Sequence, residues 1–339
     1  MFKEVTIKVP GKLFIAGEYG VTRPNGKALV AAIETPFFVS VKERSGLSKF
    51  HTNVGLEDFE FDVNHFEVPN HSWNFATQAL KNCIELIQSE KNDQFSELKH
   101  PLPQLLISIE SDLGFGENKK GYGSSASVVV GVTQAVNQFL DGKIPEDLQF
   151  EAAAKAHREV QKSGSMGDVA SITTHGVIFY QAPDEHFKNW KIETQEWKKN
   201  NWSTYIVRTG KSVKTAEKLT LSLPESFFEK SDQLVEKIAA LKFKNCPPNR
   251  RFSAFKQLIL ENQQLLITHL PQGYVTEKLA FALTIINEKS NLVGKISGAG
   301  FGENMVVFAK NEKEINEIKE KLEQNDIILE KIRILDEER

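Results

Sequence analysis

The chain of 339 residues is long enough for two domains of ordinary size. Its charges nearly cancel, with 42 Lys and Arg against 45 Asp and Glu, so the composition gives no reason to expect a nucleic-acid partner. The only two cysteines, Cys83 and Cys246, form no Cys-x-x-Cys pair, which excludes a disulfide scaffold and a zinc ribbon. No stretch reaches the ~18 continuous apolar residues of a membrane helix, and the first residues lack a secretory-signal pattern. We therefore expect a cytoplasmic protein with no membrane partner.

Apolar periodicity predicts a chain that mixes strands and helices. Val5, Ile7 and Val9 alternate with polar residues, which is typical of a half-buried strand. Segment 151–162 is rich in alanine and predicts a helix, on which we expect His157 to lie at the surface. By the same criteria, strands are predicted at 13–15, 28–33, 37–41, 105–109, 204–207, 305–309 and 327–334, and helices at 72–90, 126–140, 311–324 and several times between 213 and 290.

The composition becomes polar and charged over residues 183–202. We therefore place a boundary there and expect an N-terminal domain at 1–195 and a C-terminal domain at 196–339. The order of strand, loop, helix and strand near the C-terminus, with a glycine loop at 294–302, indicates that the second domain is α+β.

A glycine-rich segment at 121–126 opens one of the predicted helices. Its glycines allow the backbone to approach a ligand closely, and the first turn of a helix offers N–H groups and a partial positive charge. These features form an anion site, to which Lys120 adds a cation. The serines of the segment either reach a phosphate or its metal ion, or simply cap the helix in a surface turn.

Two well-known phosphate loops do not match this chain. A dinucleotide-binding turn follows its strand directly, whereas a long polar segment separates Ile109 from Gly121. A Walker A loop requires a glycine upstream of Gly-Lys-Ser, and the corresponding position before Gly210-Lys211-Ser212 holds Tyr205.

Two further loops carry candidate chemistry. Asp168 ends the loop at 163–168, where an aspartate either orients a nucleophile and accepts its proton or caps the next helix. The loop at 297–303 contains three glycines between a predicted helix and a strand, so its backbone either approaches a ligand or makes a tight connection.

Basic residues near the ends of two predicted strands are candidates for contacting an acidic ligand. Lys12 lies where the opening strands meet a turn, and Arg208, Lys211 and Lys214 form a small cluster after a later strand. Solvated surface cations are the alternative for both groups.

Taken together and in this order, the motifs resemble the GHMP kinase superfamily, which includes galactokinase, homoserine kinase, mevalonate kinase and phosphomevalonate kinase. The first family motif is similar to residues 9–19, Val-Pro-Gly-Lys-Leu-Phe-Ile-Ala-Gly-Glu-Tyr, the nucleotide loop to residues 121–126, and the third motif to residues 297–303. The form of the first motif, together with Gly-Ser-Met-Gly-Asp at 164–168, is most similar to bacterial phosphomevalonate kinases.

The resemblance implies an α+β, two-domain GHMP kinase fold, with an N-terminal domain like domain 2 of ribosomal protein S5 and a ferredoxin-like C-terminal domain. It implies ATP and Mg²⁺ as cofactors, Lys12 and Asp168 as catalytic residues, and Ser124 as a metal contact. The implied nucleotide contacts are Lys120, Gly121, Gly123, Ser124, Ser125 and Ala126. The candidate substrate contacts are Glu18, Tyr19, Ser165, Arg208, Lys211, Ser297, Gly298 and Ala299.

The reaction implied is ATP-dependent phosphorylation of 5-phosphomevalonate to 5-diphosphomevalonate in the mevalonate pathway of isoprenoid biosynthesis, by a monomer or homodimer that takes a small phosphorylated substrate. A phosphate acceptor with a second pKa of ~6 is already ionised at pH 7, so it needs no strong base. Bringing two polyanions together instead requires cations and aligned N–H donors.

Two alternatives remain from the sequence. One is a kinase acting on a hydroxyl, such as mevalonate kinase, in which Asp168 would have more to do as a base. The other is a catalytically silent nucleotide-binding member of the family. Phe301 and Glu303, which stand where the third family motif has glycine and aspartate, motivate this second alternative. The retained Lys12, Ser124 and Asp168 argue against it.

Overall fold

The computed structural model describes residues 3–89, 101–113, 120–142, 144–210, 222–241, 248–302 and 304–336. The chain forms two compact units. Unit 1 contains residues 1–11 and 34–174, and unit 2 contains residues 12–33 and 175–339. None of the helices in the described ranges is both long enough and apolar enough to cross a membrane.

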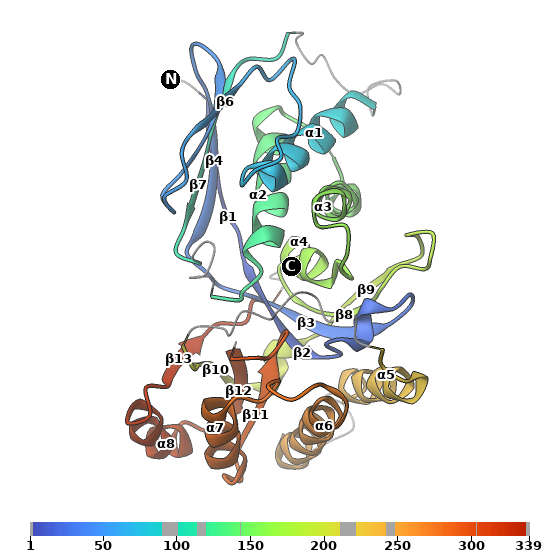
Figure 1. Cartoon of the computed structure of the whole chain (residues 1–339), viewed down its shortest axis with the longest axis vertical. Coiled ribbons are helices and arrows are strands. Elements are labelled where there is room, and N and C mark those ends of the chain that lie inside the picture. The colour runs from blue at the N-terminus through green and yellow to red at the C-terminus, as the bar shows by residue number, and fades with distance from the viewer. Residues whose placement is uncertain are drawn as a thin grey trace. The chain divides into compact units, whose positions relative to one another are not determined.

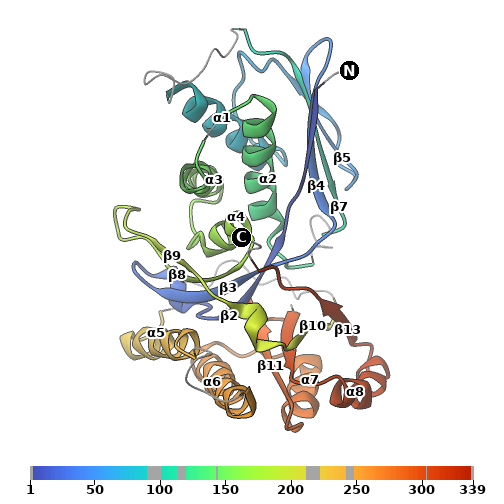
Figure 2. The ribbon, with the colours of Figure 1, turned by 180° about the vertical axis from the view of Figure 1, so that it is seen from behind.

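Unit 1 is a five-stranded sheet with helices packed on one side (Figures 1 and 2). The sheet order is β1-β4-β7-β5-β6, and β5 pairs with β7 in parallel while the other pairs are antiparallel. Phe37, Val39 and Val41 of β4 are buried and alternate with more exposed residues, as expected for a sheet covered on one face. The elements are β1 (Glu4–Lys8), β4 (Phe37–Glu43), β5 (Ser48–Thr52), β6 (Phe59–Phe61), β7 (Leu105–Ser111), α1 (Asn74–Ser89), α2 (Ser124–Phe139), α3 (Glu146–Gln161) and α4 (Gly167–Thr174).

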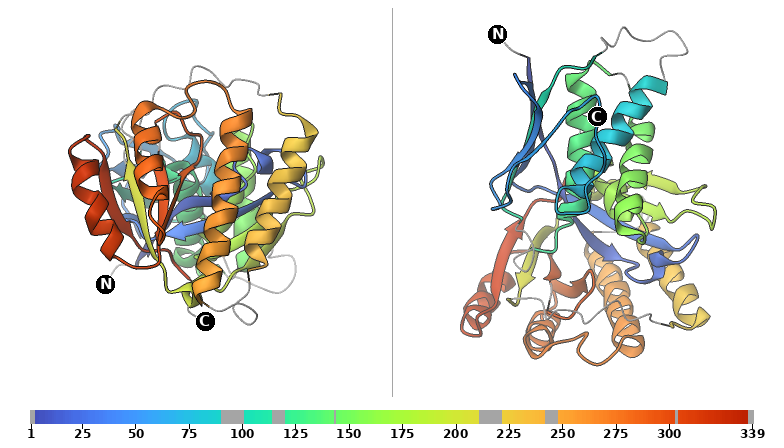
Figure 3. Two further views of the ribbon diagram at one scale, coloured as in Figure 1. Left: turned by 90° about the horizontal axis from the view of Figure 1, so that it is seen from below. Right: turned by 45° about the horizontal axis from the view of Figure 1, so that its top comes forward.

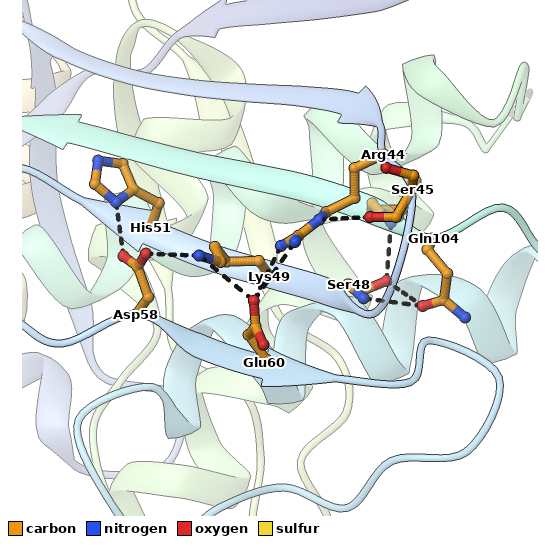
Figure 4. Close-up of polar contacts among 9 residues, drawn as sticks. Arg44, Ser45, Ser48, Lys49, His51, Asp58, Glu60 and Gln104 are labelled. Atoms are coloured by element: carbon orange, nitrogen blue, oxygen red, sulfur yellow. Dashed lines mark hydrogen bonds and ion pairs between the residues drawn. The ribbon is translucent and has the colours of Figure 1, made fainter.

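Opposite charges lie side by side on β5 and β6 and on residues next to these strands (Figure 4). Lys49 Nζ lies 3.0 Å from Asp58 Oδ2 and 3.4 Å from Glu60 Oε1. His51 Nδ1 lies 2.7 Å from Asp58 Oδ1, and Arg44 Nη1 lies 3.4 Å from Glu60. The hydrogen bond with His51, followed by that with Lys49, holds the pKa of Asp58 below its ordinary value. Because these side chains are partly exposed, the network supports the pairing of the two strands and adds little to stability.

Unit 2 contains two four-stranded sheets, ordered β2-β3-β8-β9 and β11-β12-β10-β13. Helices α5, α6, α7 and α8 lie in a row along one side of this unit (Figure 3). The strands are β2 (Gly11–Ala16), β3 (Lys27–Ile33), β8 (Val177–Gln181), β9 (Lys191–Thr194), β10 (Ser203–Arg208), β11 (Leu292–Ser297), β12 (Asn304–Ala309) and β13 (Ile328–Ile332). The helices are α5 (Glu225–Ala239), α6 (Pro248–His269), α7 (Glu277–Asn287) and α8 (Lys313–Glu323).

The division into units differs from the single boundary between residues 195 and 196 expected from the sequence. Strand β3 pairs with β8 from Lys27–Gln181 to Ala31–Val177. This pairing groups residues 12–33 with the C-terminal part of the chain, because backbone hydrogen bonds join strands regardless of their separation along the chain.

The predicted strands and helices that fall on described residues are present, with shifted ends. The helix predicted at 151–162 begins earlier, at Glu146, because Glu146 and Asp147 follow Pro145 and place negative charge in the first turn. The glycine loop predicted at 294–302 is too long, since β11 continues through Ser297. Strands β5 and β9 were not predicted because they are short and mainly polar. Strands β6, β8 and β11 and helix α4 (Gly167–Thr174) were not predicted either.

Candidate functional site

The N-terminus of α2 has the geometry of an anion site. Gly123 forms the N-cap in the left-handed region at φ 81°, a conformation that glycine adopts without strain. The first hydrogen bond of the helix runs from the Ser127 N–H to the Gly123 carbonyl, so the N–H groups of residues 124–126 precede the ladder and point out of the helix end. Ser127 is fully buried, and its hydroxyl donates to the Pro10 carbonyl at 2.8 Å. This contact fixes the start of α2 against the chain that follows β1.

A cavity of about 340 Å³ opens beside this helix end. Ser124 and Ser125 line one part of it, and Trp73 and Phe75 at the start of α1 line another. The remaining walls are mainly apolar and include Phe37, Val54, Leu56, Ile109 and Val128. An apolar, aromatic cavity next to a helix N-terminus suits a ligand that joins a planar ring system to an anionic group.

A larger cavity of about 860 Å³ lies in unit 2, among Trp197, Trp202 and Phe255. None of the described motif residues lines it. We therefore assign the candidate site to the smaller cavity, which contains the serines of the glycine-rich segment.

Asp168 lies in the first turn of α4, in the same unit as the glycine-rich segment. Its Oδ1 accepts a hydrogen bond from the Val169 N–H at 2.9 Å, and the Ser165 hydroxyl accepts one from the Gly167 N–H at 3.4 Å. Its carboxylate also raises the pKa of His157 against the larger opposite effect of burial. Unit 1 therefore holds the predicted nucleotide loop together with the predicted catalytic residue Asp168 and the predicted substrate contact Ser165.

The prediction that His157 lies at the protein surface is wrong. The residue is only 2% exposed, on the inner side of α3, rather than at the surface. Phe150, Ala153 and Ala154 are buried with it at helical spacing, so this face of α3 packs inward. His157 Nε2 lies 3.2 Å from Ser125 Oγ, directly behind the cavity wall.

The first and third motifs meet in unit 2. Ser297, at the end of β11, accepts a hydrogen bond from the Phe14 N–H at 3.1 Å and donates to the Phe14 carbonyl at 3.0 Å. Lys295 and Glu18 form an ion pair with 0% and 3% of their side chains exposed. Burial lowers the pKa of Lys295, and the Glu18 carboxylate opposes this shift. These contacts fasten the third motif to the strand and turn of the first.

Several predicted substrate contacts are thus engaged within unit 2. Glu18 and Ser297 hold the two motifs together, and the Tyr19 hydroxyl donates to the Ala299 carbonyl at 2.5 Å. Gly298 follows β11 at φ 91°. Residues 298 and 299 are the more exposed part of this loop, so their backbone is the part that an external ligand can approach.

The cations predicted at the site are distributed over both units. Lys12 projects from β2, half-buried, with Nζ 5.3 Å from the centre of the Phe14 ring. Lys120 Nζ lies 3.0 Å from Asp112 Oδ2, and Arg208 Nη2 lies 3.0 Å from Glu330. The predicted contact Lys211 and the unusual Glu303 lie outside the described residues.

Gly300 is required by the packing of the third motif. A Cβ at this position would lie 2.3 Å from Tyr274 Cδ2, a buried ring that cannot move aside. We expect Gly300→Ala to destabilise the protein by about 1–3 kcal/mol more than the left-handed backbone alone explains. Gly273→Ala is the matched control, since Gly273 has φ +95° and its nearest neighbour would be 3.7 Å away. Thermal and urea unfolding measure both variants, and equal losses would contradict the steric argument.

Comparison with known proteins identifies the family. The model for the N-terminal domain of GHMP kinases matches residues 74–176, and the model for the C-terminal domain of GHMP kinases matches residues 236–327. The two matches occur in the expected order and together account for more than half of the chain. The chain belongs to the GHMP kinases. The first match contains the glycine-rich segment and Asp168, and the family and fold expected from the motifs are confirmed.

The relatives similar to this chain include both phosphomevalonate kinases and mevalonate kinases, and they align with different shares of it. Phosphomevalonate kinase from Streptomyces sp. (strain CL190) is 29% identical over 201 residues, which is 52% of this chain and 50% of that relative. Mevalonate kinase from Methanocaldococcus jannaschii is 24% identical over 323 residues, which is 93% of this chain and 95% of that relative.

A solved structure extends the likeness in fold to nearly the whole chain. Streptococcus pneumoniae phosphomevalonate kinase, in complex with phosphomevalonate and AMPPNP, superposes with a TM-score of 0.78 at 18% identity. The superposition covers 96% of this chain and 99% of that GHMP kinase.

Among the described residues, no group of three His, Cys, Asp or Glu side chains is arranged to hold a metal ion.

Four residues beside the motifs had no functional role predicted from the sequence: Trp73, Phe75, His157 and Lys295. Only for His157 was a signal present, since it continues the apolar spacing of Phe150, Ala153 and Ala154.

Proposed function

We propose that this GHMP kinase transfers a phosphoryl group from ATP to 5-phosphomevalonate, giving 5-diphosphomevalonate in the mevalonate pathway of isoprenoid biosynthesis. The observation that carries the kinase assignment is the aromatic cavity at the N-terminus of α2. Support for the acceptor comes from the phosphomevalonate kinases among the similar proteins and from the Gly-Ser-Met-Gly-Asp sequence at 164–168.

The nucleotide fits the cavity in one orientation. Its base and ribose take the apolar part between Trp73 and Phe75, and its phosphates take the end of α2. At that end, the N–H groups of the first turn and the serine hydroxyls supply donors for the phosphate oxygens. The proposed contacts are Lys120, Gly121, Gly123, Ser124, Ser125 and Ala126.

The residues present are compatible with Mg²⁺ bound mainly through the nucleotide. Mg²⁺ prefers oxygen ligands and usually keeps several waters beside phosphates and one or two protein groups. The Ser124 hydroxyl at the cavity wall is the proposed protein contact. When bound, the ion neutralises charge on the phosphates during transfer.

Catalysis by this chain then depends on charge and orientation. We assign Lys12 to the transferred phosphoryl group, where an ammonium stabilises the developing negative charge. Asp168 orients Lys12 or the acceptor, and no strong base is needed because a phosphate acceptor is ionised at pH 7. The proposed acceptor contacts are Glu18, Tyr19, Ser165, Arg208, Lys211, Ser297, Gly298 and Ala299.

Three of these contacts are proposed with a specific condition. Arg208 is paired with Glu330, so it would bind the acceptor phosphate by replacing the Glu330 carboxylate. Ser297 exchanges two hydrogen bonds with Phe14, and Glu18 is buried in its ion pair with Lys295, so both would act through the shape of the loops that they hold.

Mevalonate kinase is the second candidate. It is supported by relatives of that name that align over nine-tenths or more of this chain. With a hydroxyl acceptor, Asp168 would serve as the general base, a role that contributes about 10²- to 10⁴-fold in rate.

Measurement of ADP release from Mg-ATP separates the candidates. The acceptors are mevalonate, phosphomevalonate, homoserine and galactose, each tested with the wild-type chain and with Asp168→Asn. We expect turnover with phosphomevalonate alone and its loss in Asp168→Asn. Turnover with mevalonate alone would replace the proposed acceptor by the second candidate, and nucleotide binding without turnover on any acceptor would contradict the assignment as an active kinase.

A further inference from the structure

His157 is a buried polar residue that the proposed reaction does not use. It lies on α3 between two residues of the cavity wall. Its ring centre is 5.2 Å from that of Phe75, and its Nε2 is 3.2 Å from Ser125 Oγ. The side chain is 2% exposed, so water does not replace these contacts. His157 therefore supports both the aromatic wall and the hydroxyl wall of the cavity from behind.

The surroundings of the ring determine its proton arrangement. Burial lowers the pKa of His157, which favours the neutral ring with a single N–H group. Nδ1 is buried and has no hydrogen-bond partner among the described residues. A buried N–H group without a partner is rarer in proteins than an acceptor left without one. We therefore assign the proton to Nε2, so that Nε2–H donates to Ser125 Oγ.

This hydrogen bond has a consequence for the Ser125 hydroxyl. The oxygen already accepts one hydrogen bond, so its own proton remains available to an acceptor on the cavity side. Ser127, two residues further along α2, differs because its hydroxyl donates to the Pro10 carbonyl inside the protein. The two serines of the same helix thus have opposite orientations, one toward the cavity and one toward the core.

We propose that His157 is a positioning residue for the nucleotide: its Nε2–H holds Ser125 so that the serine hydroxyl donates to a phosphate oxygen of ATP. The inference rests on the proposed function, because it takes ATP as the ligand of the cavity. It also divides the two adjacent serines by role, with Ser125 as a donor to phosphate and Ser124 as the contact to the metal ion.

The test compares two replacements of similar length. His157→Gln keeps an N–H donor near the position of Nε2, whereas His157→Met removes it and retains most of the volume. Binding of Mg-ATP is measured by calorimetry, and the KM for ATP and kcat are measured on the acceptor that the wild-type chain uses. We expect His157→Met to weaken ATP binding and raise the KM for ATP by about tenfold, with kcat within about twofold. His157→Gln should remain close to wild type in both.

A double variant tests the route through Ser125. Ser125→Ala should weaken ATP binding as His157→Met does, and the combination should be no weaker than Ser125→Ala alone, because both changes remove one interaction. Additive losses would overturn the proposal. So would unchanged ATP binding in a folded His157→Met chain or, if that chain does not fold, in folded Ser125→Ala.

The wild-type control separates this inference from the proposed function. A wild-type chain that does not bind Mg-ATP would overturn both. A wild-type chain that binds and turns over ATP, with His157→Met indistinguishable from it, would overturn the role of His157 alone. Ser127→Ala serves as a control for indirect effects of changing α2, and we expect it to lower the melting temperature without a selective rise in the KM for ATP.

Discussion

We expect replacement of Lys12 with alanine to lower kcat by about 100- to 1,000-fold while the affinity for ATP changes little. The side chain belongs to β2 of unit 2, and Lys12 is not among the residues that line the cavity proposed for the nucleotide. Its proposed contact forms with the phosphoryl group in transfer, so the loss falls on the transition state rather than on nucleotide binding.

Lys8→Ala is the matched control for this experiment. Lys8 lies four residues earlier, on β1, where its ammonium pairs with Glu34 at 2.5 Å. The steady-state kcat and the calorimetric affinity for Mg-ATP are measured for both variants and the wild-type chain. We expect Lys8→Ala to leave kcat unchanged. A kcat for Lys12→Ala equal to that of the wild type would remove Lys12 from the mechanism.

Replacing Lys295 with methionine should give the largest loss of stability. The change leaves Glu18 buried without its charged partner, and removing one member of a buried ion pair costs about 3–5 kcal/mol. Because Glu18 Oε2 already has no hydrogen-bond partner in the described structure, the carboxylate has little other compensation. For domains of this size, we expect a fall in melting temperature of about 10 °C.

Two further variants complete this test: the double variant Lys295→Met/Glu18→Gln, and Lys289→Met, which breaks a partly exposed ion pair. Removing both charges should restore part of the lost stability, because a neutral amide costs less to bury than an unpaired carboxylate. Lys289→Met breaks the partly exposed pair of Lys289 with Glu317, and we expect only a small change. Melting temperatures from calorimetry measure all three. Equal losses for Lys295→Met and Lys289→Met would contradict a structural role for the buried pair.

Local sequence patterns predicted the parts of the site that depend on neighbouring residues. Gly123 and the serines that follow it predicted a helix start able to bind an anion, and the structure has that helix start. Helix ends and turns depend on a few consecutive residues, whose backbone preferences are written in the local sequence. The strands predicted from apolar runs or from apolar alternation are present, whereas the short polar strands β5 and β9 carry neither pattern.

The burial of His157 shows that composition was a poor guide to which residues of α3 face the core. The alanine-rich composition of α3 predicted the helix, but composition alone does not tell which side faces inward. The spacing of Phe150, Ala153, Ala154 and His157 places them on one face. A histidine on an apolar face is buried when a partner is available, and here that partner is Ser125 on α2.

The sequence by itself determined the family, the order of most strands and helices, and the glycine-rich helix start, because each is encoded in short segments or in their order. Only the tertiary structure decided that residues 12–33 join the C-terminal unit, that Lys295 is the partner of Glu18 across 277 positions, and that His157 reaches Ser125. These contacts arise from packing between segments far apart in the chain. Strands pair and buried charges meet because they lie close together in space. The residue spacing within one segment does not encode which distant segment lies nearby.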